Sequence, residues 1–585
     1  MHKGIQKMQK SIKKEKKEVV EMKKIPYGMS NFRAMREEGY LYVDKTMYIE
    51  KIENLNSKYL FFIRPRRFGK SLFLSTLENY YDINNEKDFE KLFGDLYIGK
   101  KPTKLKNSYM ILKLNFSGLN TENKDQLKES FLLSVKNSIN ALLGRYEGIL
   151  GNTEEIREKI DQITDINAVI MTLINEVKKV GKKIYLIIDE YDHFANDIIA
   201  MGESEFYREI VRASGFVRDF YETLKIGTES VIDRIFITGI SPIMLDDLTS
   251  GFNIALNVTM DLSLNEMLGF TEEEVVKILE EVGIEEKENL INNLRELYDG
   301  YKFNKNAKTR VYNPDMVLYF LAQYKNTGGY PEYLIDDNVK TDYGRLNRLT
   351  MNEENKALLE RIIKEEGIVA EIVTKFSFDR MYDEEYFISL LFYMGLLTIK
   401  DYRYNILELG IPNYVIKTMY WEYFSKKLKE ENNIKYEMLE IAKAIWEMAF
   451  EGKIKNFVKF ISEKVLKVLS NRDTIKFDEK YIKIILFSYL TMSNIYKLIS
   501  EKETEGGYID IYLEKDIRMP DVKYEWLIEL KYVKKSDEKY IEEIREKGKE
   551  QLKRYRESMQ FKDKQNLKKA LVVFIGKGDY KIFEE

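Results

Sequence analysis

The amino-acid sequence predicts a multidomain α/β protein. Its 585 residues exceed what one hydrophobic core ordinarily serves, so three or four domains are expected. In the N-terminal half, three apolar runs near residues 59–63, 184–188 and 235–239 read as strands of a parallel sheet. Near the C-terminus, segment 508–532 contains two runs with strand-like alternation, which is typical of an antiparallel hairpin.

The first apolar run leads into a short basic loop, and an amphipathic helix then opens with Gly69, Lys70 and Ser71. Backbone amides at such a helix start cradle phosphates, while Lys70 reaches the outer phosphates and Ser71 offers its hydroxyl to magnesium. The motif GxxxxGK[ST] begins with glycine, but this chain has Arg64 there. We therefore expect a phosphate-binding loop with an altered first position.

The second apolar run ends in consecutive carboxylates, Asp189 and Glu190. Asp189 would bind magnesium through the hydration shell of the ion, and Glu190 would polarise the attacking water. The alternative is that both acids merely end a core strand. The third run places Thr238 at its carboxyl end, the edge of an open α/β sheet where ligands bind. Thr238 would then sense the terminal phosphate, unless it only caps a turn.

The C-terminal hairpin carries a second candidate site. Asp510 lies on its first strand, and Glu529 and Lys531 lie on its second, two positions apart and therefore on one face. Two carboxylates can hold a hard divalent ion, and an ammonium beside them stabilises phosphate charge or orients water. A solvated ion pair is the alternative. Downstream, Gln551 and Tyr555 are four apart and share one helical face.

The amino-acid composition limits which kinds of catalytic and metal site the chain can form. The chain has no cysteine, which excludes disulfides and cysteine-ligated metals, and only two histidines, His2 and His193. A histidine-based metal cluster or a Ser-His-Asp hydrolase is therefore not expected, and carboxylate–magnesium chemistry remains. His193 is expected to pack locally. The formal net charge is −3 with lysine and glutamate interspersed, which argues against a protein that coats DNA along its whole surface.

No stretch approaches the roughly 20 apolar residues that cross a bilayer, so we expect no membrane association. Residues 1–24 are rich in lysine and lack the apolar core of a secretory signal. We expect this segment to be a charged, flexible tail. The expected location is the cytoplasm.

The C-terminal arrangement resembles the PD-(D/E)XK nuclease superfamily, and the QxxxY helix resembles its RecB-like branch. The resemblance implies that Asp510 and Glu529 are magnesium ligands and that Lys531 is the catalytic lysine. It also implies that Glu503 is an auxiliary acid and that Gln551 and Tyr555 support the active site from a helix. Relatives often carry arginine two residues before the aspartate, whereas this chain has Tyr508, a difference that bears on phosphate contact or substrate choice.

The segments RPRRFGKS, DEYD and TGISP together resemble the AAA-ATPase-like family, which is commonly fused to such a nuclease. Further motifs follow in the family's order, among them IPYGMSNF, YLYVDKT, MLGFT, LYDGYKF, VYNP and GIPNYVI. In that family arginine at the first loop position is usual. The implied nucleotide contacts are Arg66, Arg67, Phe68, Gly69, Lys70, Ser71, Leu72, Asp189 and Thr238. The alternative for Arg66 and Arg67 is that they are simply solvated. Asp192 matches the third acid of a DExD-like pattern, and the resemblance assigns it no role.

These resemblances imply a division of the chain into five parts. They are a tail (1–24), an AAA-like P-loop ATPase domain (25–265), a helical or winged-helix lid (266–350), a mostly helical connector (351–430) and a PD-(D/E)XK nuclease-like domain (431–585). The lid would relay movement, and the alternative is that it binds DNA.

The predicted function is an ATP-binding and ATP-hydrolysing protein that controls a magnesium-dependent nuclease, with ATP and Mg²⁺ as cofactors. Its expected partner is nucleic acid, DNA in the first place, and assembly into a homo-oligomer is left open. One alternative is an ATP-switched binding or signalling module, related to defence or mobile DNA, with an inactive nuclease fold. Another is a degenerate ATPase that only supports the nuclease.

Overall fold

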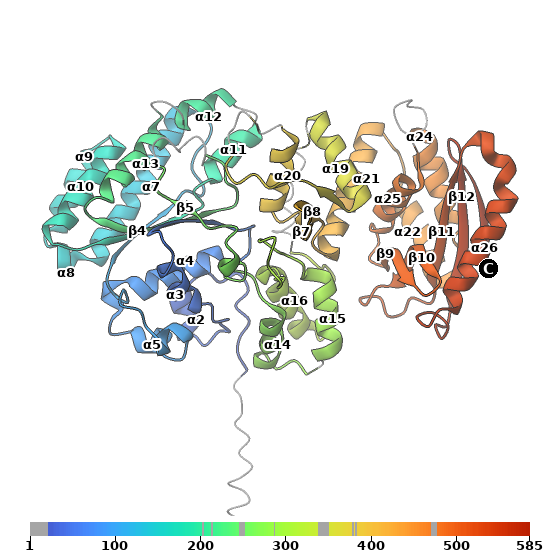
Figure 1. Cartoon of the computed structure of the whole chain (residues 1–585), viewed down its shortest axis with the longest axis horizontal. Helices are drawn as coiled ribbons and strands as arrows, with labels where there is room; N and C mark the ends of the chain where they lie inside the picture. Colours follow the sequence, from blue (N-terminus) through green and yellow to red (C-terminus); the bar gives the residue numbers. More distant parts are fainter. Residues whose placement is uncertain are drawn as a thin grey trace, which may run out of the picture. The chain divides into compact units, whose positions relative to one another are not determined.

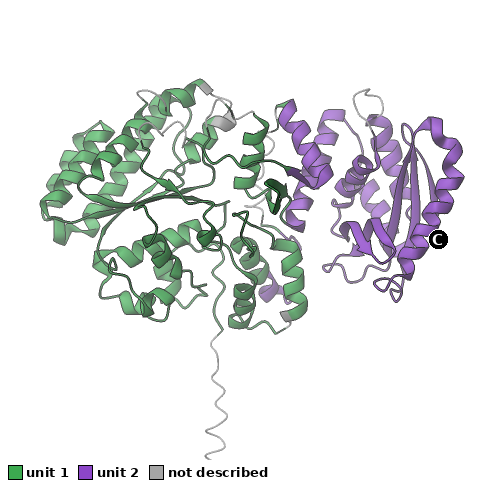
Figure 2. Cartoon of the chain, in the orientation of Figure 1, with its two compact units in different colours: residues 1–322, 335–352, 369–412 green, residues 323–334, 353–368, 413–585 purple. Residues whose placement is uncertain are grey.

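The computed structural model describes residues 22–201, 204–211, 215–244, 252–285, 287–336, 350, 352–376, 380, 383–469 and 477–584. The chain forms two compact units, coloured separately in Figure 2. Unit 1 contains residues 1–322, 335–352 and 369–412, and unit 2 contains 323–334, 353–368 and 413–585. Most of the tail predicted for residues 1–24 lies outside the described residues.

Unit 1 is built on a parallel sheet, as the sequence predicts. Its strands are β1 (Tyr59–Ile63), β2 (Met110–Asn115), β3 (Ile184–Asp189), β4 (Ile232–Gly239) and β5 (Leu256–Asn257). They lie in the order β2-β3-β4-β1-β5, and every described neighbour pair is parallel. Strand β3 is buried along its whole length, which explains its continuous apolar sequence. Strands β1, β4 and β3 are neighbours and run parallel, so their carboxyl ends lie at the same end of the sheet. The predicted functional segments that follow these strands therefore leave the sheet at that end.

Helices cover both faces of this sheet (Figure 1). One face is covered by α2 (Phe32–Glu37), α3 (Met47–Glu53) and α4 (Lys70–Tyr81), near α5 (Phe89–Phe93). The other is covered by α7 (Lys124–Arg145), α10 (Ile166–Lys179) and α13 (Phe216–Gly227). The remaining helical elements of this region are η1 (Ile83–Asn85), α6 (Tyr97–Lys100), α8 (Glu147–Leu150), α9 (Thr153–Gln162), α11 (His193–Met201) and α12 (Ser204–Val211).

The region predicted as a lid is mainly helical. It contains α14 (Glu272–Glu281), α15 (Lys287–Tyr298) and α16 (Pro314–Thr327), and the short η2 (Leu262–Leu264) lies just before it. Thr271 and Glu274 form a capping box that fixes the start of α14. Two antiparallel bridges, Phe270–Tyr312 and Tyr301–Val311, tie the MLGFT, YDGYKF and VYNP segments together.

The rest of unit 1 contains α20 (Glu384–Tyr393) and a hairpin of β7 (Thr398–Arg403) and β8 (Ile406–Gly410). This hairpin lies within the region predicted as a mostly helical connector, 351–430. The strand β6 (Gly367–Val369) lies where the chain passes from unit 2 to unit 1.

Unit 2 has a mixed sheet in the order β13-β12-β11-β10-β9. Its strands are β9 (Tyr496–Thr504), β10 (Gly507–Lys515), β11 (Glu525–Val533), β12 (Leu567–Ile575) and β13 (Asp579–Glu584). The predicted hairpin is the antiparallel pair β10–β11. Strands β11 and β12 are parallel, and helix α26 (Ile541–Glu557) makes the crossover between them.

Helix α26 covers one face of this sheet and packs on β10, β11 and β12, while helices that precede β9 lie on the other side (Figure 1). Leu552 and Tyr555 of α26 belong to a buried cluster with Leu527, Leu571 and Val573. The remaining elements are α19 (Glu353–Glu365), α21 (Tyr414–Asn432), α22 (Met438–Trp446), α23 (Lys455–Phe460), α24 (Lys467–Leu469), α25 (Glu479–Leu490), η6 (Lys535–Tyr540) and the π-helices η4 (Glu447–Glu451) and η5 (Ile461–Leu466).

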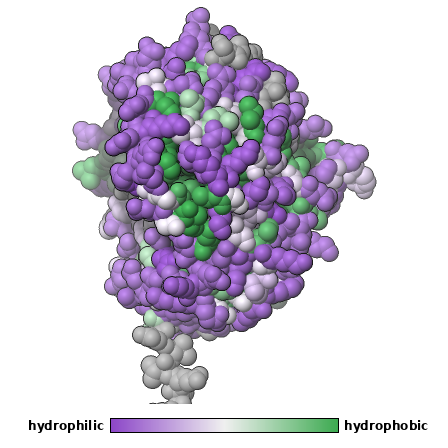
Figure 3. All heavy atoms as spheres, turned by 90° about the vertical axis from the view of Figure 1, so that its left-hand side faces the viewer, coloured by the Kyte–Doolittle hydropathy of each residue, from purple (hydrophilic) through white to green (hydrophobic). Residues whose placement is uncertain are grey.

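The face of the molecule in Figure 3 is largely hydrophilic, with hydrophobic side chains gathered near its middle. Single exposed apolar side chains are normal on a protein surface. None of the helices within the described residues combines the length and the apolar character needed to cross a bilayer.

Candidate active sites

The loop between β1 and α4 has the backbone of a phosphate-binding loop. Gly69 caps α4 with a φ of 89°, a left-handed conformation that suits glycine. Lys70 donates hydrogen bonds of 2.9 Å to the carbonyl oxygens of Arg64 and Pro65, so its ammonium turns back over the loop. The hydroxyl of Ser71 donates to Asp189 Oδ2 at 2.9 Å. The predicted lysine, hydroxyl and carboxylate are thus brought together.

Charge at this edge of the sheet is arranged around Lys70. Burial lowers the pKa of Lys70 to about 8, and the nearby carboxylates Asp189, Asp192 and Glu190 act in the opposite direction. Asp189 is itself buried at the end of β3. Glu190 has a φ of 49°, and its amide donates to Asp189 Oδ1 at 3.0 Å. This unusual backbone turns Glu190 into the same cavity that Lys70 lines.

The hydroxyl of Thr238 is buried at the carboxyl end of β4 and has no hydrogen-bond partner within the part of the chain that the structure describes. A buried hydroxyl without a partner is costly, which makes it suited to meet a ligand at this edge. The neighbouring Asp192 is fully engaged: it accepts from the amides of Ile240 and Ser241 and from the Ser241 hydroxyl, the last two at 2.8 Å. Asp192 therefore ties the segment after β3 to the segment after β4.

Arg64, which replaces the first glycine of the motif, is a buried structural residue. Its guanidinium donates to the carbonyl oxygens of Ile63, Thr259 and Leu264 at 2.7–3.0 Å. It also lies over the rings of Phe62 and Phe303, at 4.2 and 4.1 Å from their centroids. Arg64 thus joins the phosphate-binding loop to the segment that leads into the lid, a role that the motif alone does not indicate.

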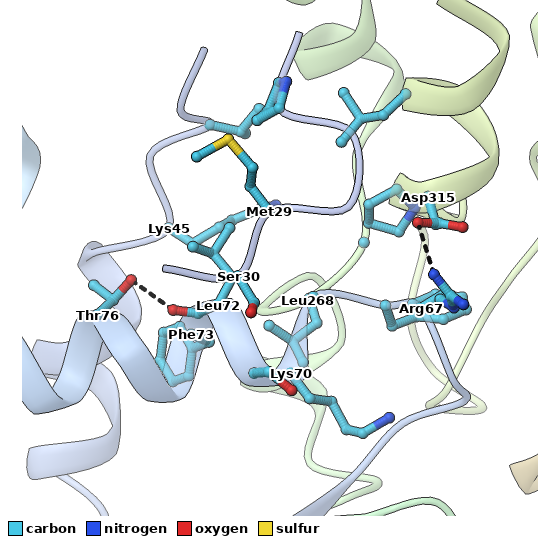
Figure 4. Close-up of a pocket in the computed structure, with 18 of the residues that line it drawn as sticks. Met29, Ser30, Lys45, Arg67, Lys70, Leu72, Phe73, Thr76, Leu268 and Asp315 are labelled. Carbon is cyan, nitrogen blue, oxygen red and sulfur yellow. Dashed lines mark hydrogen bonds and ion pairs between the residues drawn. The ribbon is translucent and has the colours of Figure 1, made fainter. Parts of the chain in front are cut away.

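A cavity of about 460 Å³ opens above the loop, within the size range of small-molecule sites. Figure 4 shows Lys70, Leu72 and Phe73 on one side and Met29 and Ser30 on another. The remaining lining residues include Val43, Lys45, Arg66, Phe68, Gly69, Ser71, Glu190, His193, Leu268 and Leu318. Residues before β1, the loop, and residues 267–270 and 314–318 therefore enclose the space.

Two predicted loop contacts have additional partners. Arg67, with a φ of 66°, lies with its Nη1 3.6 Å from Asp315 Oδ1 at the start of α16 (Figure 4). The ring of Phe68 is buried and packs edge-on against Tyr301 and Phe303. Among the loop residues, Phe68 therefore contributes its side chain to the core of the unit.

The second site forms where β10 and β11 separate. Their ladder runs over Ile511–Leu513 and stops before Asp510. Where the next backbone hydrogen bond between the strands would form, the Asp510 carboxylate instead accepts a hydrogen bond of 2.9 Å from the Leu530 amide. This hydrogen bond positions Asp510 beside the strand that carries Glu529 and Lys531.

Lys531 links the two predicted carboxylates. Its Nζ lies 2.8 Å from Glu529 Oε1 and 3.4 Å from Asp510 Oδ2. Burial lowers the pKa of Lys531, but Asp510 and Glu529 outweigh that effect, and the net pKa lies above its ordinary value. Glu529 is only 1% exposed, and burial together with Asp510 raises its pKa to about 7.

A further acid at this site was missed by sequence reasoning. Glu479, the first residue of α25, accepts the Tyr532 amide at 3.3 Å and has Oε2 3.9 Å from Lys531 Nζ. Burial raises the pKa of Glu479. The sequence places it far from the hairpin, in a region rich in acids, and no spacing rule singles it out.

Helix α26 brings Tyr555 to the same site. Burial raises the pKa of Tyr555, with smaller contributions from Glu529 and Asp510, and Gln551 hydrogen-bonds to its side chain. Its hydroxyl donates to the Tyr508 carbonyl oxygen at 2.8 Å. By contrast, the predicted auxiliary acid Glu503 is exposed at the outer end of β9 and accepts from the Tyr508 hydroxyl at 3.3 Å. Within the described part of the chain, the ion pairs of Lys531 are with Glu479, Asp510 and Glu529, and Glu503 does not join them.

The residues at the second site fit a magnesium ion. Glu529 Oε2 is buried and has no hydrogen-bond partner among the described residues, so one carboxylate oxygen is available to a ligand. No group of three or more histidine, aspartate or glutamate side chains among the described residues is arranged to hold a metal by itself. Magnesium typically takes one or two carboxylates and completes its shell with water and phosphate oxygens, which matches Asp510 and Glu529. In unit 1, Ser71 and Asp189 offer the corresponding oxygens.

Two family models match the chain, one in each half. Residues 26–249 match the family model of a predicted AAA-ATPase, and residues 477–584 match the PD-(D/E)XK nuclease superfamily. The chain joins an AAA-ATPase-like domain to a PD-(D/E)XK nuclease-superfamily domain. The AAA-ATPase-like match covers β1, α4, β3 and β4, and the nuclease-superfamily match covers α25 to β13. Both family resemblances inferred from the motifs are therefore confirmed.

A curated relative, an uncharacterized protein in the vnfD 5′ region of Azotobacter chroococcum mcd 1, is 28% identical over 323 residues. The match covers 54% of this chain and 56% of that protein, so the chain spans little more than half the length of the relative. Among solved structures, a Walker-type ATPase of Pyrococcus abyssi has a TM-score of 0.38 at 14% identity, covering 64% of this chain and 94% of that one. The ORC2 protein of Aeropyrum pernix has a TM-score of 0.27 at 11% identity, covering 70% and 99%.

Proposed function

We propose that the AAA-ATPase-like domain binds and hydrolyses ATP and thereby controls a magnesium-dependent nuclease that cleaves phosphodiester bonds, with DNA the expected substrate. One observation carries the nuclease part: Lys531 contacts both Asp510 and Glu529 where β10 and β11 separate. Such an arrangement combines oxygen ligands with a cation beside the reacting phosphate. The expected place of action is the cytoplasm, and self-assembly remains an open part of the proposal.

In the nuclease-superfamily domain, Asp510 and Glu529 would hold the metal, and Glu479 lies next to them on α25. When bound, magnesium supplies charge stabilisation at the phosphate and a water of lowered pKa. Lys531 places a positive charge where the phosphate gains negative charge, since two carboxylates hold its ammonium in position. Tyr555, supported by Gln551, holds the backbone of β10 next to Asp510.

In the AAA-ATPase-like domain, the start of α4 and Lys70 would bind the phosphates, while Ser71 and Asp189 would hold magnesium. Glu190 faces the cavity and would orient the attacking water and accept its proton. The unpartnered hydroxyl of Thr238 would meet the terminal phosphate. Arg66 and Arg67 lie at the cavity and would add positive charge near the phosphates.

Helix α16 supports control of one activity by the other. It begins in unit 1, where Asp315 and Leu318 line the cavity, and its residues from Gln323 onward belong to unit 2. Within unit 2, the carbonyl oxygen of Glu332 accepts from Arg518, in the segment that connects β10 and β11. The chain therefore runs continuously from the nucleotide cavity to a contact with the hairpin that carries Asp510 and Glu529.

The test is cleavage of labelled single- and double-stranded DNA and RNA with magnesium, with and without ATP. Wild type is compared with Lys531→Ala and Lys70→Ala, and Lys535→Ala, at an exposed position of η6, is the control. We expect cleavage to disappear in Lys531→Ala and to lose its ATP dependence in Lys70→Ala. Full cleavage by Lys531→Ala would contradict the assigned nuclease site.

A second candidate function is an ATP-switched binding or signalling module whose nuclease fold only holds nucleic acid. One observation favours it: Lys531 Nζ already contacts both carboxylates, so the arrangement of these three side chains does not depend on a metal. Nucleic-acid binding that depends on ATP, with no cleavage of any of these substrates in magnesium, would select this function.

A further inference from the structure

Tyr508 is an exposed aromatic side chain beside the second site. It is 57% exposed, whereas Tyr512, four residues further along the same strand, is buried. Tyr508 precedes Asp510 by two positions, so both side chains project from the same face of β10. Exposure alone does not indicate a function, since isolated exposed apolar side chains are common. The surroundings of the ring are what distinguish it.

The strand is open at this point. The ladder of β10 with β9 continues to Gly507, while its ladder with β11 covers only Ile511–Leu513. Tyr508 therefore lies on the part of β10 that extends beyond the β11 ladder. Continuing that register would place Tyr508 across from Lys531. The backbone at Tyr508 thus borders the gap between the two strands, next to the residues that carry Lys531 and the two carboxylates.

The position of Tyr508 is fixed by the same residues that border the acids. Its carbonyl oxygen accepts from the Tyr555 hydroxyl at 2.8 Å, and its own hydroxyl donates to Glu503 Oε1 at 3.3 Å. The adjacent Gly507 has a φ of 119°, and a Cβ there would lie 3.6 Å from the Tyr555 ring. A rigidly held aromatic ring loses little conformational entropy on binding.

The charges next to the ring select what can bind to it. Glu503 contacts the Tyr508 hydroxyl, and Glu505 lies in the same β9–β10 turn, where its carboxylate reaches the Met559 amide. The carboxylate of Glu503 at the ring's hydroxyl disfavours a phosphate at this position. An uncharged nucleobase has no such penalty, and its flat face stacks on an aromatic ring. A base inside a duplex is already paired and stacked, so the ring favours an unpaired base.

We propose that Tyr508 stacks on an unpaired nucleobase next to the phosphate at the second site, so that the bound nucleic acid is single-stranded there. This inference rests on the proposed nucleic-acid binding of the nuclease-superfamily domain and specifies its substrate class.

The test measures binding of full-length protein to fluorescein-labelled oligonucleotides by anisotropy, with EDTA present to prevent cleavage. A single-stranded 12-mer, the same strand with one abasic site at each position in turn, and its duplex are compared. The variants are Tyr508→Ala and Tyr508→Phe, with Tyr540→Ala as a control at a comparably exposed tyrosine of the same unit.

We expect Tyr508→Ala to weaken single-strand binding about 10-fold, with duplex binding unchanged, because one stacking contact is lost. Tyr508→Phe should bind like wild type. One abasic position should weaken wild-type binding by a similar factor and leave Tyr508→Ala unaffected. Equal losses for single strand and duplex, or equal losses in Tyr508→Phe and Tyr508→Ala, would overturn the proposal, as would absence of single-strand binding by wild type.

These results separate the inference from the proposed nuclease activity. If wild type does not cleave in magnesium but Tyr508→Ala still loses single-strand binding selectively, the stacking role holds and the nuclease proposal fails. If wild type cleaves and Tyr508→Ala binds single strands normally, the nuclease proposal holds and the stacking role fails.

Discussion

Lys531 Nζ lies 2.8 Å from Glu529 Oε1, and the other carboxylate oxygen of Glu529 is buried with no hydrogen-bond partner among the residues described. Glu529 thus has one oxygen engaged by a cation and one oriented into the site. Burial and Asp510 together raise the pKa of Glu529 to about 7. Its charged form is therefore costly until a second cation is present.

This cost predicts how stability changes with pH in metal-free protein. The folded pKa of Glu529, about 7, lies above the ordinary value of 4.5. The folded state therefore binds this proton more tightly than the unfolded state, and its stability contribution is present below pH 4.5 and lost as pH rises to about 7. A shift of this size corresponds to a loss on the order of 3 kcal/mol.

Urea unfolding followed by tryptophan fluorescence would measure this effect, since Trp421, Trp446 and Trp526 all lie in unit 2. In EDTA, wild type should lose stability between pH 5 and pH 8, and Glu529→Gln should lose much less. Glu546→Gln, an exposed change on α26, is the matched control. Magnesium should stabilise wild type more at pH 8 than at pH 5. Parallel pH curves for wild type and Glu529→Gln would contradict the prediction.

Arg64→Gly restores the glycine of the phosphate-loop motif, and we expect it to harm the protein. The change removes the donors to the carbonyl oxygens of Ile63, Thr259 and Leu264 and leaves a cavity between two rings. We expect a loss of unfolding free energy of about 3 kcal/mol or more. Thermal unfolding and binding of a fluorescent ATP analogue would measure it. Tighter ATP binding by Arg64→Gly than by wild type would refute this role.

Glu190→Gln should separate ATP binding from ATP turnover. Glutamine fills the same space and tolerates the same backbone, but it cannot accept a proton from water. We expect nucleotide affinity within a few-fold of wild type and phosphate release reduced about 100-fold or more. Asp189→Asn is the comparison, and it should weaken magnesium-dependent binding as well. Normal phosphate release by Glu190→Gln would exclude Glu190 as the base.

Arg518→Lys should weaken the control of cleavage by ATP. Arg518 forms a two-pronged pair with Asp516, both contacts at 2.7 Å, and donates to the Glu332 carbonyl oxygen at 2.9 Å. Lysine keeps the charge and loses this fork. We expect the ratio of cleavage with ATP to cleavage without it to fall about 5-fold or more, with ATP turnover unchanged. Arg403→Lys, at an exposed position of β7, is the control, and an unchanged ratio in Arg518→Lys would count against the α16 route.

Local patterns in the sequence were enough to predict the chemistry-bearing elements. The apolar run and the following GKS predicted β1 and α4, the run ending in Asp189 predicted β3, and the alternation around Glu529 predicted β11. Each pattern lies within a dozen or so residues, where helix and strand periods are visible. Both family resemblances rest on these short segments, and the family comparisons confirmed them.

Long-range contacts could not be predicted in the same way. Glu479 lies on a helix that starts before the hairpin, yet it approaches Lys531. The sequence showed Arg64 only as an altered first position of the loop, and its buried contacts with Thr259 and Leu264 come from a distant segment. Charged residues are frequent in this chain, so their spacing alone does not distinguish a buried acid from a solvated one.

The sequence by itself determined the two kinds of domain, their order, and the residues able to carry phosphate and metal chemistry, because those depend on local periodicity and side-chain type. Only the tertiary structure decided which of these residues meet, that Arg64 holds the loop, and that Glu479 joins the second site. Burial, pKa and pairing depend on neighbours that are distant in the chain, and folding alone brings them together.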